Sequence, residues 1–224
     1  MIEITSEELI QDALAHGCCS FDVEHHSDLS PHRAGFEIAG ISFATENYVA
    51  YFKDTGAFKY IWDKVLELDI ECVAYNAKFD CKALIAAGLM GEYVYPKNLV
   101  DPMIAVNLLD DNRRPNMLGL KKVILDYFGH TMMEFKEAFS FGLDSPQFQA
   151  YSEDDARQEY KLWKYLKPKL EAESLLYFFQ KIMMPATKVF ADMELAGIKW
   201  DQVKGRELEG RFRALEEQLL DELK

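Results

Sequence analysis

The sequence has no apolar stretch long enough to cross a membrane, because charged residues interrupt its longest hydrophobic runs. Its first residues, MIEITSEELI, also lack the basic segment followed by an apolar segment that marks a secretory signal peptide. These absences argue against a membrane-spanning or exported protein. We therefore expect a soluble protein of the cytoplasm with no membrane partner.

Paired cysteine motifs and an excess of basic residues are missing as well. None of the four cysteines forms a C-x-x-C pair, so we interpret them as free thiols in a reducing compartment. The 38 acidic residues outnumber the 25 basic ones, and the formal net charge of −13 has the wrong sign for a module that holds nucleic acid by bulk attraction. The same charge argues less against an enzyme whose carboxylates collect metal ions, since bound cations reverse the local field where phosphate must lie.

The order of the predicted elements indicates an α/β fold. With 224 residues, 49% of them hydrophobic, the chain is long enough for one full domain and a small appendage. We predict strands over 18–24, 36–44, 47–52, 71–75 and 93–100, and helices over 6–16, 58–68, 77–87, 102–109, 117–128 and most of the chain from 151 onward. This order predicts a mixed sheet flanked by helices, with a helical C-terminal tail.

The strand at 18–24 carries the first acidic pair. Side chains alternate along a strand, so Asp22 and Glu24 share one face while Phe21 and Val23 occupy the other. A D-x-E triplet is common in an acidic protein, where it usually lies on a solvated strand edge. It becomes informative only if other acids are directed at the same place.

Two further acids lie on helix faces that should be buried. Asp80 shares a stripe with Leu84, and Asp155 lies one turn from Tyr151 on a face that continues through Leu162. A buried carboxylate is costly unless it is paired or binds a metal ion. Both helices therefore direct an acid toward the interior.

Four inward-facing carboxylates need a counter-charge, because they would otherwise repel one another strongly. Oxygen-only ligands suit Mg²⁺ or Mn²⁺, and the absence of inward histidines or cysteines argues against zinc. Two such ions at a spacing of about 4 Å stabilise the attacking and leaving oxygens of a phosphoryl displacement. We expect a site for two divalent cations formed by these metal ligands: Asp22, Glu24, Asp80 and Asp155.

The order D-x-E, N-x-x-x-D and Y-x-x-x-D resembles the three exonuclease motifs of the DEDD superfamily, in the tyrosine branch typified by the proofreading domain of family A DNA polymerases. Residues 100–112 resemble the segment that follows the second motif in those polymerases. Residues 184–201 resemble the junction where their polymerase domain begins. The resemblance covers nearly the whole chain.

This resemblance implies a ribonuclease-H-like fold and a 3′-5′ exonuclease that releases nucleoside 5′-monophosphates from the 3′ end of single-stranded DNA. The implied role is proofreading during DNA replication, with a polymerase domain or partner, in a bacterial or phage-infected cell. Asp22, Glu24 and Asp155 would hold the metal that activates water, and Asp22 would share the second metal. Asp80 would act partly through bound water, and the hydroxyl of Tyr151 would orient the attacking water.

Three residues are candidates for nucleic-acid binding. Asn76 and Lys78 would touch the terminal nucleotides, and Leu29 would lie beside the last base. Ordinary roles stay open for two of them, since Asn76 also suits a helix N-cap and Lys78 suits a solvated position.

The chain departs from the family pattern beside the acids. Val23 lies between Asp22 and Glu24 where threonine is usual, and the histidines that follow, His25 and His26, are interpreted as part of a surface loop. Ala150 stands where the histidine branch has its general base. A base of that type is therefore absent.

We expect a domain boundary near residue 174. Residues 1–174 would form the exonuclease domain, and residues 175–224 a helical segment resembling the start of a family A polymerase domain. In this segment an apolar stripe recurs at helical spacing. Its members are Leu208, Phe212, Leu215 and Leu219.

Two alternatives remain. An exoribonuclease of the same branch would carry the same acids, because they read the phosphate and not the sugar. A catalytically inactive, structural exonuclease fold is the second, although such a relic should have lost ligands that this chain retains.

Overall fold

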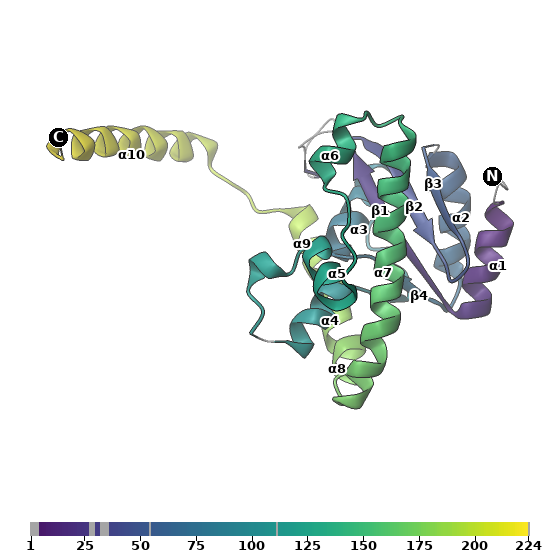
Figure 1. Ribbon diagram of the computed structural model, residues 1–224. Coiled ribbons are helices and arrows are strands. Elements are labelled where there is room, and N and C mark those ends of the chain that lie inside the picture. Colours follow the sequence, from purple (N-terminus) through teal and green to yellow (C-terminus); the bar gives the residue numbers. More distant parts are fainter. Residues whose placement is uncertain (1–4, 27–29, 32–35, 54, 111, 224) are drawn as a thin grey trace.

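A five-stranded mixed sheet forms the centre of the protein (Figure 1). The computed structural model describes residues 5–26, 30–31, 36–53, 55–110 and 112–223. The strands are β1 (Cys18–His25), β2 (Ile38–Ala44), β3 (Val49–Phe52), β4 (Glu71–Val73) and β5 (Asn98–Val100), in the spatial order β3-β2-β1-β4-β5. β1, β2 and β3 pair antiparallel, whereas β4 and β5 run parallel to β1. The predicted mixed sheet is confirmed.

Helices cover both faces of the sheet. α1 (Ser6–His16), α2 (Thr55–Glu67) and α3 (Ala77–Ala86) enclose one core with Phe21 and Val23. On the other face α7 (Pro146–Ala172) crosses β1 and β2 and packs with α4 (Pro102–Leu109). Three shorter elements complete this side: η1 (Pro115–Met117), α5 (Leu120–Phe128) and α6 (Phe135–Ser140). β1 thus separates two buried layers.

Two elements begin five residues away from their predicted starts, whereas the bounds of several others shift by one to three residues. The strand expected over 93–100 is only Asn98–Val100, because Tyr93 has a φ of 63° and Pro96 lacks the N–H that a ladder needs. α7 begins five residues earlier than predicted, since Ser145 caps it by accepting a hydrogen bond from the Phe148 amide at 3.1 Å and Pro146 suits the first turn.

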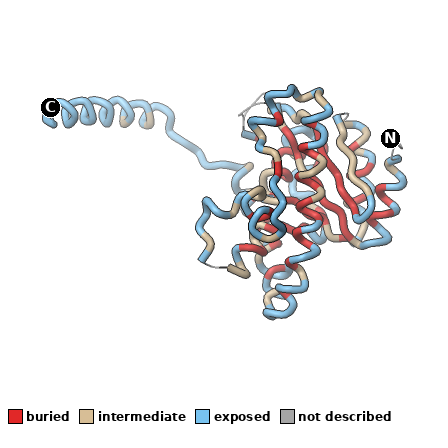
Figure 2. The backbone as a smooth tube through the Cα atoms, viewed as in Figure 1, coloured by how far each residue is buried: buried red, intermediate tan, exposed pale blue. Residues whose placement is uncertain are grey.

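The C-terminal segment consists of α8 (Leu176–Phe178), the π-helix η2 (Phe179–Met183), α9 (Met184–Ala196) and α10 (Gln202–Glu222). Phe179 stacks on Trp163 of α7 with ring centroids 5.4 Å apart, and α9 packs against α3. α10 extends away from the body, and none of its residues is buried (Figure 2). None of the helices within the described ranges is long and apolar enough to cross a membrane.

Candidate active site

β1 presents Asp22 and Glu24 to α7, as its alternation predicts. Phe21 and Val23 are buried on the opposite face, in the core with α1 and α2. Asp22 is half-buried, whereas Glu24 is only 5% exposed. The strand therefore holds two carboxylates on the face that α7 covers.

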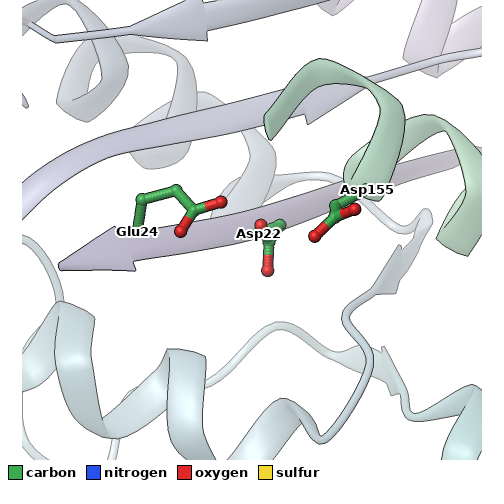
Figure 3. A group of neighbouring side chains, drawn as sticks. All are labelled: Asp22, Glu24 and Asp155. Carbon is green, nitrogen blue, oxygen red and sulfur yellow. The ribbon is translucent and has the colours of Figure 1, made fainter. Parts of the chain in front are cut away.

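α7 contributes the third carboxylate of the cluster. One oxygen each of Asp22, Glu24 and Asp155 lies within 4.8 Å of the other two, and Figure 3 shows the three carboxylates facing one another. Two serines tie the helix to the strand at this point. Ser20 Oγ donates to the Ala156 carbonyl at 2.7 Å, and Ser152 Oγ donates to Glu24 Oε1 at 3.1 Å.

Asp80 borders this cluster from the first turn of α3. The pairing of β1 with β4 ends at Ser20 and Val73, so the Val23 amide lies beyond the end of β4. That amide donates to Asp80 Oδ1 at 3.1 Å, and Asp80 is only 3% exposed. The Asp80 carboxylate thus accepts the hydrogen bond that the carbonyl of a neighbouring strand would accept in a longer sheet, and it does so beside Asp22.

Crowding of the acids raises their pKa values. Burial and the charge of Asp155 raise the pKa of Asp22 to about 7. Burial and Asp22 raise the pKa values of Glu24 and Asp80 well above their usual range. Burial likewise raises the pKa of Asp155 to about 6, although Lys121 opposes the rise. Each carboxylate is costly to ionise here without a cation.

The donor set fits a divalent cation. Among the described residues, the buried Oδ1 atom of Asp155 has no hydrogen-bond partner, and it belongs to a carboxylate of the cluster. Oxygen atoms of several carboxylates gathered in this way are the ligands that Mg²⁺ and Mn²⁺ prefer.

Tyr151 lies one turn before Asp155 on α7 and is 6% exposed. Its ring packs on Phe148 and Phe135, with centroids 5.8 and 6.3 Å away. Burial and the charge of Asp155 raise its pKa, so the phenol keeps its proton at neutral pH. The hydroxyl is therefore suited to orienting a group by hydrogen bonding and not to acting as a base.

A protein family described as 3′-5′ exonuclease matches residues 2–171, which is most of the chain. The chain belongs to this family, the 3′-5′ exonuclease domains of family A DNA polymerases. Metal dependence is a property of DEDD exonucleases, and the carboxylate cluster agrees with it. The activity of a 3′-5′ exonuclease acting on nucleic-acid 3′ ends follows from the family.

Curated relatives of this exonuclease are bacterial DNA polymerases I. The enzyme of Treponema pallidum is 30% identical over 131 residues, which cover 56% of this chain and 13% of the polymerase. That of Chloroflexus aurantiacus is 32% identical over 146 residues, which cover 62% of this chain and 15% of the polymerase. The matched region is thus a small part of each relative's length.

Solved structures confirm the ribonuclease-H-like exonuclease fold. RNase D of Escherichia coli, an exoribonuclease, superposes with a TM-score of 0.68 at 16% identity over 84% of this chain and 49% of its own. NrnC of Brucella melitensis with bound Mg²⁺ also superposes with a TM-score of 0.68, at 17% identity over 83% of this chain and 89% of its own. At such low identity the likeness concerns the fold.

Two residues near the cluster of this exonuclease were missed from the sequence. Lys121 of α5 donates from Nζ to Tyr151 Oη at 3.3 Å and to Asp155 Oδ2 at 3.2 Å. Glu159 follows Asp155 by one turn, is 1% exposed, and its Oε2 has no hydrogen-bond partner among the described residues. Glu159 continues the inward stripe of Tyr151 and Asp155, so helical periodicity offered a signal. Nothing in the sequence separates Lys121 from Lys122.

The three candidates for nucleic-acid binding have different surroundings. Asn76 occupies the N-cap position of α3 with a φ of 62°, but its side chain makes no capping hydrogen bond. Asp101 instead accepts the amides of Asn76 and Ala77, both at 3.0 Å. Lys78 pairs with Glu194 of α9, and Leu29 lies outside the described residues. Their contact with substrate stays a prediction.

The interpretation of His25 as part of a surface loop is wrong. His25 ends β1 directly after Glu24, and three aromatic rings surround it: Phe36, Phe79 and Phe135, with centroids 5.9, 5.4 and 6.4 Å away. The strand continues one residue beyond its predicted end because His25 still pairs with Ile38 of β2 after an irregularity in register.

Proposed function

We propose that this exonuclease removes nucleotides from the 3′ end of single-stranded DNA, as a proofreading module of a family A DNA polymerase or beside one. The observation that carries the proposal is the convergence of Asp22, Glu24 and Asp155 within 4.8 Å. Asp80 and Tyr151 border this cluster, as the three-motif pattern requires. The DNA polymerase I relatives favour DNA as the substrate, and their bacterial origin supports a bacterial cytoplasm as the location.

In this proposal Asp22, Glu24 and Asp155 would hold one Mg²⁺ or Mn²⁺ ion, and Asp22 would share a second, with Asp80 acting partly through bound water. Such ions lower the pKa of water and stabilise charge on the scissile phosphate. The protonated hydroxyl of Tyr151 orients the attacking water. Water then loses a proton and adds to phosphorus, and the bond to the 3′ oxygen breaks. That oxygen takes up a proton and becomes the 3′-hydroxyl of the shortened strand, while a nucleoside 5′-monophosphate is released.

The test is stepwise shortening of a 5′-labelled single strand from its 3′ end, with and without EDTA. Asp22→Ala or Asp155→Ala should lower the rate by several orders of magnitude, since each removes a metal ligand. Asp154→Ala is the matched control, because Asp154 adjoins Asp155 in sequence but pairs with His130 at 2.9 Å. We expect the control to stay within a few-fold of the parent. Undiminished activity in Asp22→Ala or Asp155→Ala would contradict the assignment of the site.

RNA is the second candidate substrate, because RNase D, whose fold this chain shares, is an exoribonuclease. Single-stranded DNA and RNA of matched sequence should be compared at equal enzyme concentration. We expect faster degradation of DNA. Faster degradation of RNA would assign the exoribonuclease role and leave the metal site intact.

We also propose that the exonuclease domain comprises residues 1–174 and that residues 175–224 correspond to the start of a polymerase-like segment. In that case this segment packs against the exonuclease domain through Phe179 and α9. The ion pair between Lys82 Nζ and Glu194 Oε2, 2.7 Å apart, supports that docking. α10, with no buried residue, supports a helix that lies outside the domain.

A further inference from the structure

Lys121 places a positive charge against the carboxylate cluster. It lies in the first turn of α5, and its Nζ donates to Tyr151 Oη at 3.3 Å and to Asp155 Oδ2 at 3.2 Å. Nζ also lies 4.4 Å from the centroid of the Tyr151 ring, and the side chain is 22% exposed. Packing over the ring and two hydrogen bonds therefore confine the ammonium group.

The neighbouring Lys122 shows that this placement is particular to one side chain. Lys122 Nζ pairs with Asp126 at 2.8 Å along the solvent side of α5, and its side chain is 49% exposed. The two lysines have the same charge and length and adjoin in sequence, but only Lys121 contacts Tyr151 and Asp155 among the described contacts. Lys122 is therefore a matched control.

The contacts of Lys121 define the hydrogen bonding of the tyrosine. The oxygen of the Tyr151 hydroxyl accepts a hydrogen bond from Lys121 Nζ, which also donates to the Asp155 carboxylate. A hydroxyl oxygen can accept a second hydrogen bond. Because Lys121 occupies one acceptor position of the oxygen, the hydroxyl can contact water beside the cluster through its proton or its second lone pair.

We propose that Lys121 is a positioning residue of the exonuclease reaction, which holds the Tyr151 hydroxyl in the orientation that receives the attacking water. The inference rests on the proposed function of Asp22, Glu24 and Asp155. Lys121 acts through Tyr151 and need not touch the substrate. Its charge also competes with cations for Asp155, because like charges near one carboxylate repel.

The test is a double-mutant cycle on release of mononucleotides from single-stranded DNA. Lys121→Met should lower kcat about 10- to 100-fold with KM within a few-fold, as expected for loss of one orienting group. In a Tyr151→Phe background the same substitution should cost less than about 3-fold, because the hydroxyl that it positions is already gone. Lys122→Met should leave both constants within about 2-fold. Lys121→Arg, which keeps the charge and donors, should recover part of the loss.

A second measurement does not depend on activity. Without nucleic acid, Lys121→Met should bind Mn²⁺ several-fold more tightly than the parent or Lys122→Met, measured by electron paramagnetic resonance of free Mn²⁺. Thermal unfolding of each variant identifies loss of fold, in which case Lys121→Gln, which also removes the charge, replaces Lys121→Met in the cycle.

Two outcomes would overturn the proposal. Equal losses from Lys121→Met in the parent and Tyr151→Phe backgrounds would mean that Lys121 acts independently of the tyrosine. An unchanged kcat in Lys121→Met would mean that it has no role in the reaction. Asp22→Ala separates these from failure of the proposed function, since an active Asp22→Ala enzyme would refute the site itself.

Discussion

Replacing Asp22 with asparagine should stabilise the metal-free exonuclease while removing a proposed metal ligand. Burial and the nearby charge of Asp155 raise the pKa of Asp22 from 3.8 to about 7. Asparagine keeps the size of the side chain but cannot ionise. The substitution therefore removes the free-energy cost of a carboxylate among carboxylates.

The sign and size follow from the two pKa values. Between pH 3.8 and about 7 the folded protein keeps a proton on Asp22 that the unfolded chain has released, so the stability cost grows with pH and is constant above about 7. At about 1.36 kcal/mol per pKa unit, the full rise corresponds to about 4 kcal/mol. Solvent reaches the half-buried side chain and screens part of this. We expect a gain of about 1–3 kcal/mol at pH 8 and almost none near pH 4.

Urea denaturation in EDTA at pH 4 and pH 8 measures this gain. Asp12→Asn is the control, because Asp12 is a satisfied carboxylate that accepts the Asn47 amide at 3.0 Å and Asn47 Nδ2 at 2.8 Å. Although burial opposes it, hydrogen bonding from Thr45 and Asn47 lowers the pKa of Asp12, so this substitution should destabilise at pH 8. Saturating Mn²⁺ should reverse the ranking of parent and Asp22→Asn, because a ligand at about 1,000 times its Kd for the parent adds about 4.1 kcal/mol, which exceeds the expected gain.

A loss of stability for Asp22→Asn in EDTA at pH 8 would refute the reasoning. It would show that the Asp22 carboxylate is a net stabilising group, compensated by Lys121 and nearby amides. A gain of equal size at both pH values would also refute it, because the cost would then not come from ionisation.

Three further outcomes are expected. Tyr151→Phe should lower kcat roughly 10- to 1000-fold, less than loss of a metal ligand, and a loss as complete as that of Asp22→Ala would assign the tyrosine another role. Burial and the charge of Asp22 raise the pKa of Glu159, so its ionisation destabilises the folded protein as the pH rises. Glu159→Gln should therefore raise the melting temperature in EDTA more at pH 8 than at pH 5. The opposite order would show that Glu159 is stabilising when ionised. Deleting residues 202–224 should leave the exonuclease activity on short single strands within a few-fold of that of the full chain, since α10 has no buried residue. A truncated protein that is folded but inactive would show that the tail is part of the active enzyme.

Periodicity explains which parts of the site the sequence could predict. Alternation along a strand placed Asp22 and Glu24 on one face, and helical spacing placed Asp155 one turn from Tyr151. These relations are local, because the backbone geometry of one element sets them. The structure adds that separate elements bring the carboxylates together, and this is where Asp80 meets the Val23 amide.

Other features depend on contacts between distant segments and left no local signal. Asp101 caps the start of α3 from 25 residues away, which no pattern around Asn76 indicates. Lys121 and Lys122 are equivalent in sequence, and only the packing of α5 against α7 decides which one reaches Tyr151. Glu159 was within reach of the helical pattern, but a glutamate on an otherwise charged helix is easily assigned to the solvent face.

The hydrogen bond from the Val23 amide to Asp80 makes the site visible to nuclear magnetic resonance. In an ordinary sheet such an amide reports on the carbonyl of a neighbouring strand. Here its partner is a carboxylate beside Asp22, so its proton chemical shift should follow the charge that Asp80 carries. A single labelled backbone position thus offers a spectroscopic record of proton release and cation entry in solution, before any nucleic acid is added.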